Sequence, residues 1–287
     1  MGLFRSTRLL AAVLAVVAAV GVTAPPAGAT VQQPYVALGD SYTAGPLIPI
    51  QLPDPLGCGR SDHNYPHVVA RSRGAVLHDV SCSGATTEDL FSPQQVFGGP
   101  NPAQLDALDG AVQVVTIQIG GNDIGFSEIL QRCAAAFPVG TPCQDAYVHG
   151  GVDELSRRIA DTGPKVAAAL TEARRRAPNA RAFVVGYPAI LPEAYPGCWP
   201  VMPFAPADVP YLRGVEKELN AMLAARAAAA GDSYVDLYTP STGHDACQLP
   251  LVRWVEPVIP LSLAAPVHPN LFGMQAMAGV VGAAIAA

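Results

Sequence analysis

Five short apolar stretches alternate with segments that suit helices, and this alternation is the feature that most limits how the chain can fold. The stretches are Tyr35–Leu38, Ala75–Val80, Val112–Ile119, Arg181–Val185 and Ser233–Leu237. Strands that are separated by helical segments form parallel sheets covered by helices. The pattern therefore predicts an α/β protein with a central, mostly parallel five-stranded sheet.

Helix and loop signals fill the spaces between these stretches. Helices are predicted over Val152–Arg176, with a break or kink at Gly163-Pro164, and over Val209–Ala230, which ends at Gly231. A third is predicted from Pro269 to Ala287. Proline is frequent in 46–55 and 188–210, and because proline cannot donate to a strand ladder, both segments are predicted to be loops.

Residues 1–29 have the pattern of a secretory signal peptide. Two arginines precede an apolar run, Leu9 to Val22, and small residues end it at Ala27-Gly-Ala29. A retained membrane anchor is the alternative, but the run is shorter than the ~20 residues that span a bilayer. The prediction is therefore cleavage after Ala29, an extracellular protein, and one domain over residues 30–287.

The net charge argues against a nucleic-acid partner. It is −6 for the whole chain, and loss of Arg5 and Arg8 with the leader makes it −8. Phosphate binding needs clustered cations, and the single basic cluster, Arg174-Arg-Arg176, ends a predicted helix, where it complements the helix dipole. We expect a monomer that binds a small-molecule or lipid ester and touches lipid surfaces only transiently.

Six cysteines in an exported chain indicate three disulfides, although sequence alone allows fifteen connectivities. We predict that neighbours pair, as Cys58–Cys82, Cys133–Cys143 and Cys198–Cys247. A metal site is the alternative. It is disfavoured because no pair is spaced Cys-x-x-Cys and no histidine falls at zinc-finger spacing. The spacing of Asp62, His63 and His67 is thin evidence for a metal, so no cofactor is expected.

Three segments that could carry chemistry follow predicted strands. Ser41 follows the first strand in Gly39-Asp-Ser41, Ser83-Gly84 follows the second, and Asn122 follows the third in Gly120-Gly-Asn122-Asp123. Loops at the carboxyl ends of parallel strands open into one crevice. A serine needs a base to remove its proton and donors to hold an oxyanion, and His268-Pro-Asn270 lies near the C-terminus. The tetrapeptide Gly39-Asp-Ser-Tyr42 recurs at Gly231–Tyr234. In this second copy the serine, Ser233, begins a predicted strand, so it should lie at the opposite edge of the sheet from Ser41.

These four blocks, in this order, resemble the SGNH, or GDSL, hydrolase family, and the cysteines and leader resemble its secreted actinobacterial esterases and lipases. The resemblance implies a three-layer α/β/α sandwich of flavodoxin-like type. It implies that Ser41 is the nucleophile, that His268 is the general base and that the oxyanion hole is formed by the backbone N–H groups of Ser41 and Gly84 with the amide of Asn122. Asp40 and Asp123 are interpreted as turn residues that fix these loops.

The chain departs from the family at the acid. Ala265 stands three residues before His268, where the family usually has aspartate. The nearest carboxylate on the N-terminal side of His268 is that of Glu256. A main-chain carbonyl, that of Ala265 or alternatively Pro266, is predicted to accept the Nδ1 proton, with Asp245 a weaker candidate for the partner. A carbonyl keeps Nε2 free to act as base, and it should raise the histidine pKa less than an aspartate would.

The acyl pocket is predicted to use apolar walls from 46–56, 190–204 and Leu249–Val267. Such walls favour esters of medium-to-long acyl chains. Three alternatives remain open: a carbohydrate O-acetyl esterase, a phospholipase, and a non-catalytic protein that binds lipid or glycan.

Overall fold

The computed structural model describes residues 1–2, 33–194 and 196–287. At its centre five strands form one sheet in the order β2-β1-β5-β8-β9, and every pairing is parallel. The strands are β1 Pro34–Gly39, β2 Val76–Asp79, β5 Val114–Gln118, β8 Arg181–Val185 and β9 Ser233–Val235. This confirms the predicted α/β class and all five strands. The predicted signal peptide lies outside the described residues apart from its first two.

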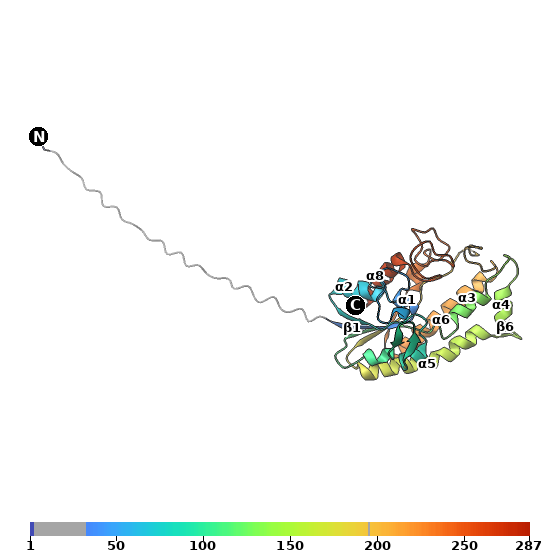
Figure 1. The fold of residues 1–287 in the computed structure, drawn as a ribbon, viewed down its shortest axis with the longest axis horizontal. Helices are drawn as coiled ribbons and strands as arrows, with labels where there is room; N and C mark the ends of the chain where they lie inside the picture. Colours follow the sequence, from blue (N-terminus) through green and yellow to red (C-terminus); the bar gives the residue numbers. More distant parts are fainter. Residues whose placement is uncertain (3–32, 195) are drawn as a thin grey trace. The chain divides into compact units, whose positions relative to one another are not determined.

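Helices cover both faces of the sheet, which makes the three layers (Figure 1). Tyr35 and Ala37 of β1 pack in one apolar cluster with α2 (Tyr65–Arg73) and α8 (Leu271–Ala286). Val36 and Leu38, which alternate with them, pack in a second cluster with α5 (Glu154–Arg176) and α6 (Val209–Ala230). Successive strand residues point to opposite faces, so a fully apolar β1 is what a sheet buried on both sides requires.

Helix α5 does not break at Pro164. It runs from Glu154 to Arg176 with the proline inside, so the predicted break at Gly163-Pro164, one of the two alternatives, does not occur. An internal proline costs ~3 kcal/mol. One face of the helix buries Leu155, Ile159, Val166 and Leu170, and each such side chain contributes about 1.5–3 kcal/mol. Burial of this face therefore outweighs the local penalty.

The other elements are short. The helices are α1 Ser41–Ala44, α3 Phe126–Arg132, α4 Pro142–Tyr147 and α7 Tyr238–Ser241, with single 3₁₀ turns at Leu56–Cys58, Thr87–Leu90 and Gln104–Ala107. Two small hairpins pair β3 Gln94–Val96 with β4 Gly99–Asn101, and β6 Val148–His149 with β7 Val152–Asp153. Among the helices described, none combines the length and the apolar character that crossing a membrane would need.

The six cysteines form three disulfides, Cys58–Cys82, Cys133–Cys143 and Cys198–Cys247. The predicted neighbour pairing is confirmed. The loops that they close span sequence separations of 24, 10 and 49 residues. Linking a separation of this size restricts the unfolded chain and stabilises the fold by roughly 3–4 kcal/mol per bridge.

Candidate active site

Ser41 lies where β1 ends and the short helix α1 begins. Asp40 caps this helix, and its carboxylate accepts from the N–H of Tyr42 at 2.9 Å. The chain passes close to β5 here, because a Cβ added to Gly39 would lie 2.8 Å from the carbonyl oxygen of Gln118. The turn therefore requires glycine at position 39, because a side chain there would clash with β5. The Ser41 side chain is 7% exposed, at the carboxyl edge of the sheet.

The imidazole of His268 contacts the serine hydroxyl directly. Its Nε2 lies 2.7 Å from Ser41 Oγ, although the two residues are 227 positions apart. Its Nδ1 lies 2.7 Å from the carbonyl oxygen of Pro266. A proton on Nδ1 bonded to that carbonyl leaves the lone pair of Nε2 facing Ser41.

The histidine's partner is thus Pro266, and the first choice of the sequence analysis, Ala265, is wrong. Val267 adopts a left-handed backbone conformation with φ of 56°, which is rare for a β-branched residue. This turn brings the Pro266 carbonyl to the imidazole. Ala265 is tied to another loop through its N–H, which donates to the carbonyl of Pro46 at 3.0 Å.

Aromatic rings flank His268. The rings of Tyr42 and Phe126 have centroids 5.0 and 6.0 Å from the imidazole, and the Tyr42 hydroxyl donates to the Val267 carbonyl at 2.7 Å. Burial lowers the pKa of His268, and the hydrogen bond to the Pro266 carbonyl opposes this effect only in part. The imidazole is therefore held in its neutral form, because the carbonyl raises the pKa by less than burial lowers it.

The two other predicted oxyanion donors lie on loops that are tied together. The Asn122 amide nitrogen donates one hydrogen to the Ala85 carbonyl at 2.9 Å, and an amide nitrogen has a second hydrogen to offer. Gly84 adopts φ of +79°, which favours glycine, while a Cβ there would meet only Gln94 at an ordinary 3.7 Å. Within the described ranges, the N–H groups of Ser41 and Gly84 donate to no protein acceptor.

Tyr187 joins the nucleophile turn to the Asn122 loop, and sequence reasoning missed it. Its hydroxyl donates to Asp40 Oδ2 at 2.5 Å and accepts from the Gly121 N–H at 2.9 Å. Burial raises the pKa of Asp40 to about 7, and the bonds from Tyr187 and the Tyr42 N–H counteract part of that rise. A signal was available, because Tyr187 follows β8 by two residues and so lies at the same sheet edge as Ser41.

Asp123 fixes the neighbouring turn, in agreement with its predicted role as a turn residue. Its carboxylate accepts from the N–H and the hydroxyl of Thr87, the first residue of the 3₁₀ turn after Gly84. The loops that bear Gly84 and Asn122 are therefore joined twice, at Ala85 and at Thr87.

An apolar cavity opens at Ser41 and encloses about 730 Å³ of space, its mouth included. Besides Asp40, Ser41, Tyr42, Gly121 and Asn122, its lining comes from three places: α3 and the turn before it, α6, and the chain after β8. The lining residues from these places are Ile124, Phe126, Ile129, Leu130, Tyr187, Ile190, Leu191, Phe204, Leu212, Val215, Glu216 and Leu219. Of the three predicted walls, 190–204 contributes. Residues 46–56 and Leu249–Val267 do not line it, which corrects those two predictions.

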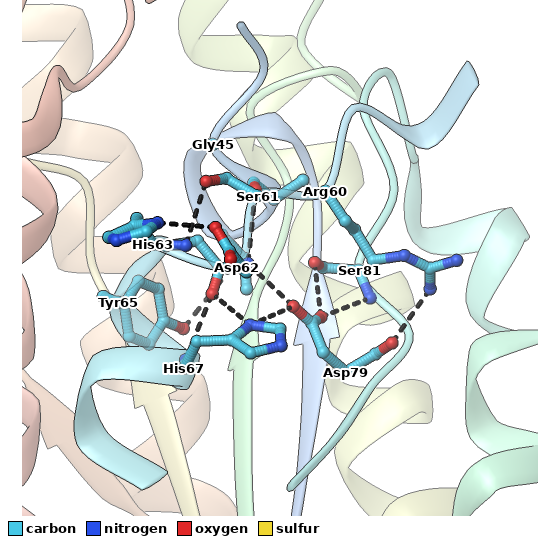
Figure 2. A network of polar contacts seen from close by, with 12 residues as sticks. Gly45, Arg60, Ser61, Asp62, His63, Tyr65, His67, Asp79 and Ser81 are labelled. Carbon is cyan, nitrogen blue, oxygen red and sulfur yellow. Dashed lines mark hydrogen bonds and ion pairs between the residues drawn. The ribbon is translucent and has the colours of Figure 1, made fainter. Parts of the chain in front are cut away.

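His63 and His67 have polar partners near the start of α2. Figure 2 shows a polar network around Asp79, whose carboxylate accepts from Asn64 at 2.7 Å and lies 3.5 Å from His67 Nδ1. Asp62 pairs with His63 at the surface. No group of three or more potential ligands for a metal ion occurs among the residues described. These histidines therefore organise the start of α2.

His244 stacks on Trp254 with ring centroids 4.3 Å apart and bonds the Val252 carbonyl, so it packs the loop before His268. Asp245 accepts from the Cys247 N–H and is not the partner of His268. Ser233 is the first residue of β9, at the amino end of a strand. The repeated tetrapeptide thus lies at the sheet edge opposite Ser41, as expected.

A hydroxyl bonded to a neutral imidazole, beside unpartnered N–H groups at the carboxyl edge of a parallel sheet, is the arrangement with which serine hydrolases attack acyl groups. Comparison with known proteins is consistent with this class. Residues 37–276 match the GDSL-like Lipase/Acylhydrolase family. The chain belongs to this family of carboxylic ester hydrolases.

Similar proteins come from Streptomyces. The chain is 43% identical to Lipase 2 of Streptomyces coelicolor over 89% of its own length and 86% of that protein. It is 33% identical to an esterase of Streptomyces scabiei, over 75% and 72% of the two chains. The extracellular lipase of Streptomyces rimosus superposes with a TM-score of 0.69 and 26% identity, over 89% of this chain and all of that one. Phospholipase A1 of Streptomyces albidoflavus shares the fold, with a TM-score of 0.72 and 24% identity over the same shares.

Proposed function

We propose that residues 30–287 form a single exported domain that cleaves acyl esters through an acyl-enzyme on Ser41. The observation that carries the proposal is the 2.7 Å contact between Ser41 Oγ and His268 Nε2 at the mouth of an apolar cavity. A serine hydroxyl is a weak nucleophile until a base takes its proton. The neutral Nε2 is placed to do so.

The reaction follows from these positions. Nε2 of His268 takes the hydroxyl proton while Oγ of Ser41 bonds to the ester carbonyl carbon. The resulting oxyanion accepts hydrogen bonds from the N–H groups of Ser41 and Gly84 and the free amide hydrogen of Asn122. His268 then gives its proton to the departing alcohol, which leaves an acyl-serine. Water, deprotonated by the same Nε2, hydrolyses that ester and regenerates the hydroxyl.

Pro266 acts on His268 through the Nδ1 proton. Its carbonyl fixes the tautomer and the ring orientation without a full negative charge. In serine proteases with an aspartate, change of that aspartate to asparagine costs ~10⁴-fold in kcat because the wrong tautomer is held. A carbonyl oxygen can only accept a hydrogen bond, so Nδ1 must carry the proton and that error is avoided.

The cavity supports medium-to-long acyl chains as substrates. Its walls are largely leucine, isoleucine, valine and phenylalanine side chains, and such walls bind hydrocarbon and offer little to a sugar. This favours lipid esters over the O-acetyl groups of carbohydrates. Phospholipid and neutral lipid present the same acyl chain to the cavity. We further propose a secreted monomer that acts without metal or cofactor and meets its lipid at a surface only transiently.

The decisive experiment is a series of p-nitrophenyl esters from acetate to palmitate, hydrolysed by the wild type and by the Ser41→Ala variant. We expect a maximum at octanoate or longer, no turnover by Ser41→Ala, and full activity of the wild type in a chelator. Hydrolysis of acetate alone would assign the chain to the acetyl esterases. Retained ester binding with no turnover by either protein would identify a non-catalytic binding protein.

A further inference from the structure

The segment 249–263 exposes more large apolar side chains than a soluble surface normally does. Five of them are two-thirds exposed or more: Leu249 (74%), Leu251 (84%), Ile259 (77%), Leu261 (72%) and Leu263 (67%). Val252 and Val258 are also exposed, so the property covers seven of the fifteen residues. Single exposed apolar side chains need no explanation, but a concentration of them marks an interaction site.

The segment itself carries no exposed charge. Between residues 246 and 287 the sequence has only two charged side chains besides His268, namely Arg253 and Glu256. Both are buried, at 3% and 0% exposed, and they pair with each other at 2.9 Å. A partner that is recognised by its charge would find nothing to bind here.

The same buried pair attaches the apolar segment to the catalytic loop. The Glu256 carboxylate accepts from the Leu261 N–H at 2.9 Å and from the Asn270 amide at 2.8 Å. The Glu256 N–H donates to the carbonyl of His268 itself, also at 2.9 Å. Three prolines, at 250, 257 and 260, further restrict the segment. The exposed side chains are therefore held beside the active site on a backbone that loses little entropy on docking.

We propose that segment 249–263 is the surface by which this protein docks on an uncharged or zwitterionic lipid surface, with its leucines and Ile259 inserted among the acyl chains. The segment lines no part of the acyl cavity, so its apolar character has no role in holding the chain being cleaved. The exposed side chains are aliphatic, whereas the centres of protein interfaces are enriched in tyrosine, tryptophan and arginine. The inference rests on the proposed function, because a hydrolase of lipid esters must reach substrate that is packed in a lipid phase.

The test measures binding to phosphatidylcholine vesicles by co-sedimentation, in the Ser41→Ala background so that no lipid is consumed. The double variant Leu251→Ser/Leu261→Ser should bind roughly 10²-fold more weakly, about tenfold for each side chain removed from hydrocarbon. Added salt should leave binding by the parent unchanged, because no ion pair is involved. The matched control is Val76→Ser, since Val76 is 52% exposed at the amino end of β2, away from the catalytic edge. Its binding should equal that of the parent.

A second measurement separates docking from catalysis. With Ser41 restored, the double variant should hydrolyse dissolved p-nitrophenyl butyrate at the wild-type rate and emulsified long-chain ester at least tenfold more slowly. Failure of the wild type on every p-nitrophenyl ester would remove the proposed function, but the vesicle assay would still report docking. The docking proposal is overturned if the double variant and Val76→Ser bind vesicles equally, or if salt abolishes binding. Loss of a concentration-dependent dimer in the double variant, with vesicle binding unchanged, would assign the segment to contact between two copies.

Discussion

The pKa of His268 sets the acid limit of the proposed reaction. The catalytic base must be neutral, and burial lowers the pKa of this imidazole from its ordinary 6.5. As pH rises, the proton is lost below 6.5, so kcat/KM should rise with a midpoint on the acid side of that value. Initial rates on p-nitrophenyl butyrate from pH 4 to 8 give this midpoint. A midpoint at 7 or above would instead point to Asp40, whose pKa burial raises to about 7.

Tyr187 is a positioning residue, and Tyr187→Phe tests it. The variant loses the bond to Asp40 and the acceptor for the Gly121 N–H, and a hydrogen bond to a buried carboxyl group contributes roughly 1.5–3 kcal/mol. We expect the free energy of unfolding to fall by about that amount in urea. We also expect kcat to fall at least tenfold with KM little changed. The reason is that the loop that bears Asn122 is then no longer held in its position relative to Ser41.

Tyr147→Phe is the control for that variant. Tyr147 is buried too, but its hydroxyl contacts Glu128 at 3.3 Å, away from Ser41. Its loss should reduce stability without a change in kcat. Equal kcat in the two variants would remove Tyr187 from the site.

At the residue scale, short blocks could be predicted and single contacts could not. Ser41, Gly84, Asn122 and His268 lie in local patterns that follow strands or open a helix. The structure brings His268 into contact with Ser41 and joins the loops that bear Gly84 and Asn122. Tyr187 has no such pattern, because its role depends on where β8 ends relative to β1. The choice between Ala265 and Pro266 depended on the left-handed turn at Val267, which no rule for a β-branched residue predicts.

At the scale of elements, the start of α8 supports the catalytic histidine. Asn270 caps this helix, accepting from the Gly273 N–H, and its amide donates to Glu256 and to the carbonyl of Arg253. Loss of a cap costs about 1 kcal/mol, and a buried carboxylate left without its donor costs about 1–3 kcal/mol more. Asn270→Ala should therefore lower the free energy of unfolding by roughly 2–4 kcal/mol in urea. It should also lower kcat, because His268 lies two residues away.

Asp153→Ala serves as the matched control, since Asp153 caps α5 through the N–H groups of Leu155 and Ser156. Its loss should cost about 1 kcal/mol and leave kcat unchanged. An Asn270→Ala protein with wild-type kcat would show that the cap does not position His268.

Most helices and strands of the sheet layers could be predicted from the periodicity of apolar residues in the sequence. The five strands and helices α5, α6 and α8 appear where the apolar patterns place them, because burial on a sheet is what those patterns record. The choice between a break and an unbroken α5 was left open, since a rule for one proline cannot include the face that the helix buries. The role of segment 249–263 was misread for a related reason: an apolar stretch is equally compatible with a pocket wall and with an exposed surface.

At the scale of the whole molecule, a partly buried carboxyl group couples stability to pH. Glu216 of α6 lines the cavity, and burial raises its pKa to about 8, although the Ile190 N–H donates to both carboxylate oxygens at 3.2 and 3.3 Å. Between the unfolded pKa of about 4.5 and 8, the folded state holds a proton that the unfolded state has released. The contribution of the neutral carboxyl group to the free energy of unfolding is therefore complete below pH 4.5. It is lost as pH rises through 8, by at most roughly 1.4 kcal/mol per pH unit.

Glu216→Gln should remove this dependence while keeping an oxygen acceptor for the Ile190 N–H. Relative to the wild type, we expect little change in the free energy of unfolding at pH 4 and a clear gain at pH 8.5, where the wild type must hold a charge in an apolar wall. Urea unfolding at the two pH values measures the difference. Glu218→Gln, on the exposed side of the same helix, should change stability equally at both. If Glu216→Gln behaves like Glu218→Gln, the carboxyl group is ionised in the folded protein, and the acyl cavity must admit enough water to solvate it.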